Sequence, residues 1–228
     1  MLVLWGAMRP TQFIRANTRL LAVPLVPEIR LHLAEESLPI WQKSEEELGA
    51  MNVPPPYWAF AWAGGQALAR YLLDNPGIVA GRSILDLGSG SGLAGIAAAK
   101  AGASRVVAAD IDVFALEAIG LNASANAVSL EIRGEDMLDG VPAPFDVVLV
   151  SDLFYERALA ARVLAFSDAA MAQGARVLAG DPRRSYFPAG RFRAEAEYSV
   201  PVTRELEDAE IKRTSVWCLE AARATSAT

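Results

Sequence analysis

The sequence predicts an α/β fold in which a mostly parallel, doubly wound sheet ends in an antiparallel hairpin. Three observations indicate this. Short apolar runs alternate with helix-sized segments from residue 83 onward, which is the pattern of consecutive βα units. The run at residues 145–150 is apolar apart from Asp146, as expected of a strand that is buried on both faces. The last two strand-like runs have no helix-sized segment between them, so they are expected to pair as an antiparallel edge.

The expected elements follow in chain order. A helix over residues 64–74 ends at Asn75-Pro76-Gly77, because proline cannot continue a helix and this tripeptide favours a turn. Strands are then expected at residues 84–87, 105–109, 129–132, 145–150 and 175–179, with helices at 93–101, 113–126 and 157–171. Two further strands near residues 195–202 and 212–220 complete the sheet.

The chain is expected to divide into three parts. Residues 1–53 form an N-terminal arm of weak periodicity that is punctuated by Pro24, Pro27 and Pro39. Residues 54–220 form the main domain, and residues 221–228 are small and polar, as in a flexible tail. A length of 228 residues suits one domain with a short extension.

Composition narrows the class of protein. Hydrophobic residues make up 53% of the chain and the net charge is −6, which provides ample core material and does not favour binding to a phosphate backbone. A single cysteine, Cys218, excludes an internal disulfide, and with His32 as the one histidine no Cys/His metal site can form. No apolar run reaches the roughly 18–20 residues of a membrane span. We therefore expect a cytoplasmic monomer that needs no metal, membrane or nucleic acid.

A glycine-rich loop, Asp86-Leu87-Gly88-Ser89-Gly90-Ser91-Gly92, directly follows the first strand of this alternation. Glycines at a strand-to-helix turn let a ligand approach the backbone closely. Two ligands compete for the loop. The stretch from Gly90 to Gly95 fits the dinucleotide pattern G-x-G-x-x-G, with Asp110 following at a suitable distance. A carboxylate at Asp86 would repel a pyrophosphate but attract the ammonium and sulfonium of S-adenosylmethionine, which is therefore the favoured ligand.

Two further acidic positions follow the next strands. Asp110 ends the second strand, where a carboxylate can accept hydrogen bonds from both ribose hydroxyls, and Asp112 is better suited to capping the next helix. Asp136 follows the third strand. It either accepts a hydrogen bond from an adenine amino group, with Met137 packed on the ring, or is a solvated loop acid. All these positions lie beyond the carboxyl ends of strands, where open α/β sheets bind ligands.

The fourth strand runs into Ser151-Asp152-Leu153-Phe154-Tyr155, which places an acid and a phenol three residues apart. In a helical turn, Asp152 and Tyr155 would lie on one face. The alternative is a helix cap at Asp152 and a core position for Tyr155.

These motifs resemble those of the seven-β-strand (class I) protein lysine methyltransferases, in which Asp-x-x-Tyr follows the fourth strand, here Asp152-Leu153-Phe154-Tyr155. Within that group the chain is most similar to the lysine methyltransferases of the electron transfer flavoprotein β subunit. The similarity covers about residues 38–220, and its most specific parts are Asp-x-x-Tyr and the aromatic segment at residues 57–68. Further matching segments are residues 70–76, 85–90, 102–105 and 110–112, and Gly180-Asp181-Pro182.

The resemblance implies a Rossmann-like sheet of seven strands with S-adenosylmethionine as the methyl donor. It implies that the acceptor is the ε-amine of a lysine in a protein substrate, the electron transfer flavoprotein β subunit. Asp152 and Tyr155 would be the catalytic residues. The cofactor-binding residues would be Trp62, Asp86, Gly88, Ser89, Gly90, Asp110, Ile111, Asp136, Met137 and Ser151.

In this reading an aromatic mouth favours the neutral form of the acceptor amine by desolvation. We expect Trp58, Phe60, Trp62 and Tyr155 to form that mouth, and Asp152 to orient the amine or receive its proton through water.

The chain also departs from the pattern. Ser91 and Leu93 differ from animal relatives, and the stretch after Asp181 looks shorter and richer in arginine. The N-terminal arm matches least, which puts the docking of a protein substrate in doubt. Other acceptors, such as a ribosomal protein or a small amine, stay open, as do a nicotinamide-dependent oxidoreductase and a non-catalytic cofactor-binding protein.

Overall fold

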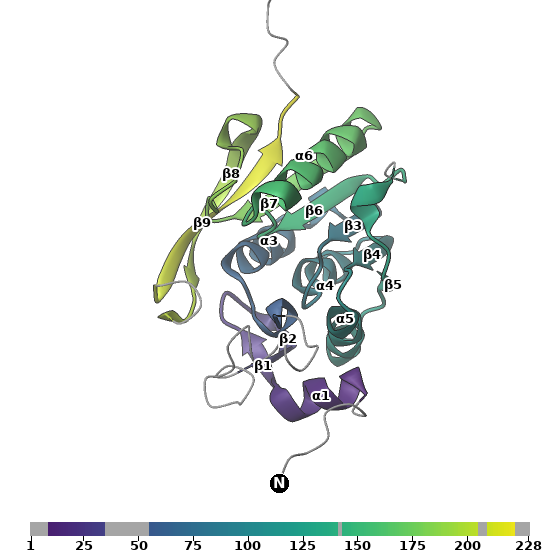
Figure 1. The fold of residues 1–228 in the computed structure, drawn as a ribbon, viewed down its shortest axis with the longest axis vertical. Coiled ribbons are helices and arrows are strands. Elements are labelled where there is room, and N and C mark those ends of the chain that lie inside the picture. Colours follow the sequence, from purple (N-terminus) through teal and green to yellow (C-terminus); the bar gives the residue numbers. More distant parts are fainter. Residues whose placement is uncertain (1–8, 35–54, 141–142, 205–208, 222–228) are drawn as a thin grey trace, which may run out of the picture.

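The structure is a computed structural model that describes residues 9–34, 55–140, 143–204 and 209–221. These residues form a seven-stranded sheet with the order β5-β4-β3-β6-β7-β9-β8 and a separate two-stranded hairpin (Figure 1). The strands of the sheet are β3 (Ser83–Leu87), β4 (Arg105–Ala109), β5 (Glu131–Arg133), β6 (Val147–Ser151), β7 (Arg176–Asp181), β8 (Phe192–Pro201) and β9 (Ile211–Leu219). Neighbouring strands from β5 to β7 run parallel, and β9 pairs antiparallel with both β7 and β8. The predicted fold class and its antiparallel edge are therefore confirmed.

Helices connect the parallel strands and cover both faces of the sheet. They are α3 (Ala63–Asp74), α4 (Leu93–Lys100), α5 (Val113–Ala125) and α6 (Arg157–Ala172), with single 3-10 turns η2 (Tyr57–Ala59), η3 (Pro76–Ile78), η4 (Met137–Asp139) and η5 (Ala189–Arg191). The central strand β6 shows the layering, because its side chains alternate. Val148 and Val150 pack in the cluster that contains α6, whereas Val147 and Leu149 pack with α3 and α4. No helix in the described part of the chain is long and apolar enough to cross a membrane.

Two predicted strands begin later than the sequence pattern suggested. Residues 129–130 stay outside β5, which pairs with β4 only from Glu131 to Arg133. Asp146 precedes β6, and its carboxylate accepts hydrogen bonds from both the N–H and the hydroxyl of Ser83, each at 2.7 Å. Side-chain hydrogen bonds of this kind compete with the regular ladder and mark strand ends.

The N-terminal arm contains regular structure that the sequence analysis did not predict. Helix α1 (Pro10–Asn17) and the antiparallel hairpin of β1 (Arg19–Val23) and β2 (Val26–Leu33) precede the main domain. Pro24 lies in the turn between the two strands. Buried side chains of the hairpin, including Ile29 and Leu31, pack on Ile96 of α4 and its neighbours. The burial pattern of β2 is not a strict alternation, which is why the periodicity was weak. The rest of the arm and residues 222–228 of the predicted tail lie outside the described residues.

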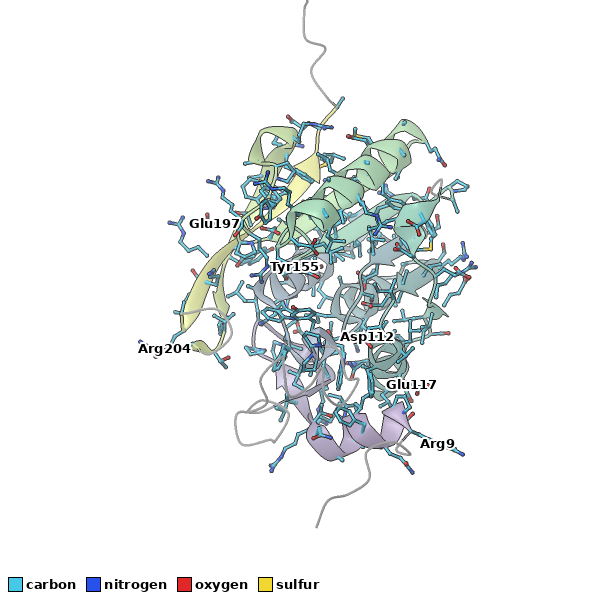
Figure 2. The ribbon with its side chains drawn as sticks, in the orientation of Figure 1. Arg9, Asp112, Glu117, Tyr155, Glu197 and Arg204 are labelled. Atoms are coloured by element: carbon cyan, nitrogen blue, oxygen red, sulfur yellow. The ribbon has the colours of Figure 1, made fainter. Side chains whose placement is uncertain are left out.

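Two asparagines at the C-terminal end of α5, Asn122 and the C-cap residue Asn126, join this hairpin to the main domain. Asn126 accepts a hydrogen bond from the N–H of Arg30 and donates one to its carbonyl oxygen. The fully buried Asn122 accepts from the N–H of His32 and donates to the carbonyl oxygen of Ser91 in the glycine-rich loop. At its other end α5 packs on α1, where Thr11 donates to Glu117 (Figure 2). The hairpin thus reaches the glycine-rich loop through Asn122.

Helix α3 crosses β7 with almost no space between their backbones. A Cβ atom placed on Gly64 would lie 2.1 Å from the carbonyl oxygen of Gly180, and one on Gly180 would lie 2.1 Å from that of Gly64. The absence of side chains at these two positions therefore permits the contact. It brings the first turn of α3 against the carboxyl ends of β6 and β7.

Candidate active site

A cavity of about 480 Å³ opens at the carboxyl ends of the parallel strands. All the predicted site residues line it, namely Trp62, Asp86, Gly88, Ser89, Gly90, Asp110, Ile111, Asp136, Met137, Ser151, Asp152 and Tyr155. Asp112 and Tyr155, both in its wall, are labelled in Figure 2. The strand topology explains the assembly, because the carboxyl ends of parallel strands meet at one edge of the sheet.

The glycine-rich loop has the backbone conformation that its sequence requires. Gly88 and Gly90 have φ angles of 60° and 53°, in the left-handed region that glycine adopts without strain. A Cβ on Gly88 would also lie 2.8 Å from the side chain of Leu153. The loop is anchored to the sheet where the N–H of Ser89 donates to the carbonyl oxygen of Ala109 at 2.9 Å. Ligand atoms can therefore approach the backbone here.

Asp86 stabilises this loop through hydrogen bonds from its buried side chain. Its side chain is buried, and Oδ2 accepts hydrogen bonds from the hydroxyl of Ser89 at 2.6 Å and the N–H of Gly95 at 2.9 Å. Burial raises the pKa of this carboxyl group to about 7, although the two hydrogen bonds oppose the shift. Beside the electrostatic role that the sequence predicts for Asp86, the structure adds this structural one.

Asp110 connects two loops at the bottom of the cavity. Its Oδ2 accepts from the N–H of Gly90 at 2.8 Å, and its Oδ1 accepts from the N–H of Asp112 at 3.0 Å. Burial raises the pKa of its carboxyl group. An ionised carboxylate has about four acceptor positions, so ribose hydroxyls can still bind here. The predicted cap is confirmed, because Asp112 accepts from the N–H of Phe114 at the start of α5.

Asp136 and Met137 form the third acidic position. Oδ1 of Asp136 accepts from the N–H of Leu138 and caps the turn η4, and Oδ2 forms an ion pair with Arg162 at 2.9 Å. The Arg162 guanidinium lowers the pKa of this carboxyl group. Asp136 is thus a partly exposed acid that is held by an ion pair, with Met137 beside it in the cavity wall, and its contact with an adenine amino group stays a prediction.

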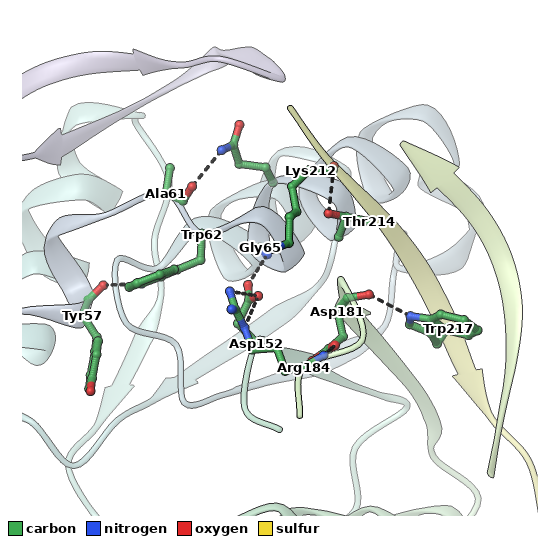
Figure 3. A network of polar contacts seen from close by, with 11 residues as sticks. Tyr57, Ala61, Trp62, Gly65, Asp152, Asp181, Arg184, Lys212, Thr214 and Trp217 are labelled. Atoms are coloured by element: carbon green, nitrogen blue, oxygen red, sulfur yellow. Dashed lines mark hydrogen bonds and ion pairs between the residues drawn. The ribbon is translucent and has the colours of Figure 1, made fainter. Parts of the chain in front are cut away.

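Asp152 also lines the cavity, in a left-handed backbone conformation that few non-glycine residues other than Asn and Asp adopt. Its φ angle is 57°, and its N–H donates to the carbonyl oxygen of Gly180. Oδ2 accepts from the N–H of Gly65 at 3.0 Å, and Oδ1 accepts from Nε and Nη2 of Arg184 at 2.9 and 2.7 Å (Figure 3). Left-handed conformations of non-glycine residues cluster at functional sites. The alternative of a simple helix cap is wrong, because Glu156 occupies the N-cap of α6.

A second carboxylate lies behind this pair. Asp181 ends β7 and is fully buried, and its Oδ1 accepts from the N–H of Arg184 at 2.7 Å. Its Oδ2 is buried without a hydrogen-bond partner among the described residues. Burial and the nearby charge of Asp152 raise the pKa of Asp181 to about 7. The sequence analysis noted Gly180-Asp181-Pro182 but assigned no role to the acid.

The aromatic mouth differs in part from the one predicted. Trp58 lines the cavity but is 1% exposed and stacks on Phe114, so it is a buried part of the wall rather than of the mouth. Tyr57 takes its place at the rim: it is 48% exposed and its ring lies 5.9 Å from that of Tyr155, which is 45% exposed. A core position for Tyr155 is therefore wrong. Burial of its hydroxyl raises the pKa of Tyr155.

Comparisons with known proteins identify relatives of this chain. A sequence profile of the ribosomal protein L11 methyltransferase (PrmA) family matches residues 66–156, which is less than half of the chain. The electron transfer flavoprotein β subunit lysine methyltransferase of Xenopus laevis is 37% identical, over 94% of this chain and 89% of the relative. The enzyme of the same name from Mus musculus is 38% identical, over 85% of this chain and 77% of the relative.

The chain belongs to the electron transfer flavoprotein β-subunit lysine methyltransferase family. The predicted resemblance is confirmed, and so is the prediction that the protein is a methyltransferase. The fold agrees with a solved structure of magnesium protoporphyrin IX methyltransferase from Synechocystis PCC 6803 with bound S-adenosylmethionine. That structure has a TM-score of 0.50 at 16% identity and covers 68% of this chain and 78% of its own.

In this member of the lysine methyltransferase family, Arg184 is the main cavity residue that was not predicted from the sequence. Its guanidinium binds Asp152 and lies 5.4 Å from the centre of the Trp62 ring, whose Nε1 donates to the carbonyl oxygen of Tyr57. The arginine-rich stretch after Asp181 was visible in the sequence. Nothing in that stretch indicated which arginine would turn into the cavity, because the contact joins residues 32 positions apart.

Proposed function

We propose that the protein transfers a methyl group from S-adenosylmethionine to the ε-amine of a lysine in the electron transfer flavoprotein β subunit. One observation carries this proposal. The cavity holds a cofactor-type loop at one end and the Asp152–Tyr155 pair at the other, in a chain of this lysine methyltransferase family. A methyl donor and an acceptor amine can therefore meet in one enclosed space.

The residues present fit S-adenosylmethionine. The left-handed glycines leave the backbone accessible, and the carboxylate of Asp110 lies where ribose hydroxyls would bind. Ser151 contributes a hydroxyl to the cavity wall that is buried and has no partner in the described part of the chain. Buried polar groups are nearly always hydrogen-bonded, so this hydroxyl indicates a ligand group beside it. We assign cofactor contacts to the ten predicted residues and catalytic roles to Asp152 and Tyr155.

The chemistry is an in-line displacement. When bound, the cofactor supplies a methyl group on a sulfonium; the amine lone pair forms the new C–N bond while the C–S bond breaks, and its electrons stay on sulfur as a thioether. The amine must first lose a proton to water. At pH 7.4 only about one lysine in a thousand is neutral, which corresponds to about 4 kcal/mol. Tyr57, Trp62 and Tyr155 lower this cost by excluding water, and Asp152 positions the amine.

Methylation of purified electron transfer flavoprotein tests the acceptor. We expect radiolabel from S-adenosylmethionine on a lysine of the β subunit, located by mass spectrometry, and no label with Asp152→Ala. Label on a ribosomal protein or a small amine instead, with the flavoprotein unlabelled, would establish the alternative acceptor.

Ligand-induced stabilisation tests the cofactor separately. S-adenosylhomocysteine should raise the Tm because it binds the folded state, and NAD should not. Asp110→Ala should weaken S-adenosylhomocysteine binding by about 1.5–3 kcal/mol, the range for hydrogen bonds to a charged group. Asp112→Ala is the matched control and should lower the free energy of unfolding by about 1 kcal/mol with the affinity retained. The cytoplasmic location, the monomeric state and the independence from nucleic acid stay predictions.

A further inference from the structure

We infer that Arg184 is a positioning residue that balances the charge of Asp152, so that the acceptor lysine is held as its neutral amine. The inference rests on the proposed lysine acceptor and assigns a role to a residue outside the predicted site. Two contacts define the arrangement, namely the two hydrogen bonds from the Arg184 guanidinium to Oδ1 of Asp152 and the position of that guanidinium over Trp62.

The physical problem is the proton of the acceptor. A bare carboxylate beside a lysine favours the ammonium, which has no lone pair with which to accept a methyl group. A carboxylate that already accepts two hydrogen bonds from a guanidinium attracts an ammonium less, and the guanidinium itself repels it. Arg184 remains protonated at every relevant pH, so this balance is permanent.

The geometry leaves the pair able to guide an amine. Asp152 and Arg184 both line the cavity, and their side chains are 9% and 18% exposed. Oδ2 of Asp152 is oriented by the N–H of Gly65. A neutral amine can donate a hydrogen bond to this carboxylate and direct its lone pair toward the methyl group. This hydrogen bond depends on the position of the Asp152 carboxylate and does not require the Asp152–Arg184 pair to carry a net charge.

Other ionisable groups surround the pair. Asp181 on β7 lies next to it, and the pKa of its buried carboxyl group is raised by the charge of Asp152 and lowered by the charge of Arg184. The other titratable groups in the cavity wall are Tyr57, Asp86, Asp110, Asp112, Glu135, Asp136, Tyr155 and Arg162. Arg184→Gln and Asp152→Asn would also shift the pKa of Asp181, up and down respectively, so each variant is measured in an Asp181→Asn background as well. A limb that no longer moves in that background would assign the limb to Asp181 and overturn the inference.

The test is the pH dependence of kcat at saturating substrates. The acid limb is the part of the profile in which kcat falls as the pH is lowered. We expect it to move to higher pH by about 1 unit in Arg184→Gln, because this variant leaves the charge of Asp152 unbalanced. We expect it to move to lower pH in Asp152→Asn, because this variant removes that charge. The double variant Arg184→Gln/Asp152→Asn restores the balance with two amides, and its limb should return to the wild-type position. The order of the four limbs would then follow the charge of the pair.

Arg183→Gln is the matched control. Arg183 lies 5.1 Å from the centre of the Trp217 ring, and its substitution should leave the limb unmoved. Binding provides a readout independent of turnover. At pH 7, with S-adenosylhomocysteine bound, Arg184→Gln should bind the protein substrate more tightly than wild type while its kcat falls, because an unbalanced carboxylate stabilises the ammonium.

Limbs that coincide in wild type, Arg184→Gln and Asp152→Asn would overturn the inference. If Arg184→Gln fails to bind S-adenosylhomocysteine, the comparison of Asp152→Asn with the double variant takes its place. The inference is overturned if the acid limb of the kcat profile of Asp152→Asn lies at the same pH as that of the double variant, or at a higher pH. Failure of the proposed function is distinct, because the wild-type enzyme would then not methylate the flavoprotein at all.

Discussion

The donor end and the acceptor end of the cavity are built from different kinds of contact. At the donor end, Asp86 binds groups three and nine residues away, and Asp110 binds the adjacent loop. At the acceptor end, Asp152 is held by Gly65 and Arg184, which lie 87 and 32 positions away in the sequence. The donor end is thus built mainly from shorter-range contacts around the glycine-rich loop, whereas the acceptor end joins α3, β6 and the segment after β7. Substitutions should separate the two.

The largest loss of stability is expected at the crossing of α3 and β7, which holds the acceptor end of the cavity in place. Gly64→Ala would place a Cβ 2.1 Å from the carbonyl oxygen of Gly180, and neither backbone can retreat. We expect a loss of about 3 kcal/mol or more in the free energy of unfolding, measured in urea. Gly77→Ala, where a Cβ meets nothing within 4 Å, is the control and should change stability by about 0.5 kcal/mol at most. Equal stability of the two variants would show that the crossing is not tight.

At the donor end, Gly90→Val should abolish S-adenosylhomocysteine binding in calorimetry. A β-branched residue resists a φ of 53°, and its side chain would enter the space where the ligand approaches the backbone. Gly174 also has a positive φ, and its Cβ would meet nothing within 4 Å. Gly174→Val should therefore lower the Tm and retain binding. Loss of binding in both variants would mean that backbone strain alone accounts for the result.

The same contrast explains what the sequence could predict. The alternating elements, the glycine-rich loop and the acids at strand ends follow from local patterns, and the structure brings all of those residues to one cavity. The fold of the N-terminal hairpin was missed because its strands are irregularly buried. Trp58 and Tyr57 are adjacent aromatics, and only the turn η2 decides that Trp58 points into the core and Tyr57 lies at the rim. Arg184 was missed because its partner depends on where β6 and β7 place their ends.

Two buried carboxyl groups, one at each end, should make stability depend on pH. Asp86 and Asp181 each have a pKa raised to about 7, so the folded state holds protons that the unfolded state has released. Each group therefore destabilises the fold as the pH rises from about 4 to about 7, by up to about 4 kcal/mol, and no further above it.

Urea unfolding between pH 4 and pH 8 measures this dependence. Asp86→Asn and Asp181→Asn should each flatten the decline relative to wild type. A decline as steep as that of wild type in either variant would show that the carboxyl group concerned titrates normally in the fold.

A smaller effect should distinguish Asn122 of α5 from Asn126, the residue that caps the helix. Asn122→Ala removes a hydrogen bond to the carbonyl oxygen of Ser91 in the glycine-rich loop, and should weaken S-adenosylhomocysteine binding by about 1 kcal/mol beyond its effect on stability. Asn126→Ala breaks similar bonds to Arg30 without contacting the loop, and should lower stability alone. Similar affinities in the two variants would show that the hairpin does not support the loop.

The separation of donor and acceptor ends is tested most directly at Asp152. Asparagine tolerates the left-handed backbone found there, so Asp152→Asn changes the charge with little strain. The measurement pairs the S-adenosylhomocysteine Kd with kcat/KM for lysine methylation on the same preparation. We predict a Kd close to that of wild type and a steep fall in kcat/KM, with a smaller fall for Tyr155→Phe than for Tyr155→Ala. Near-wild-type methylation by Asp152→Asn and Tyr155→Ala, or a Kd that weakens in parallel with kcat/KM, would contradict it.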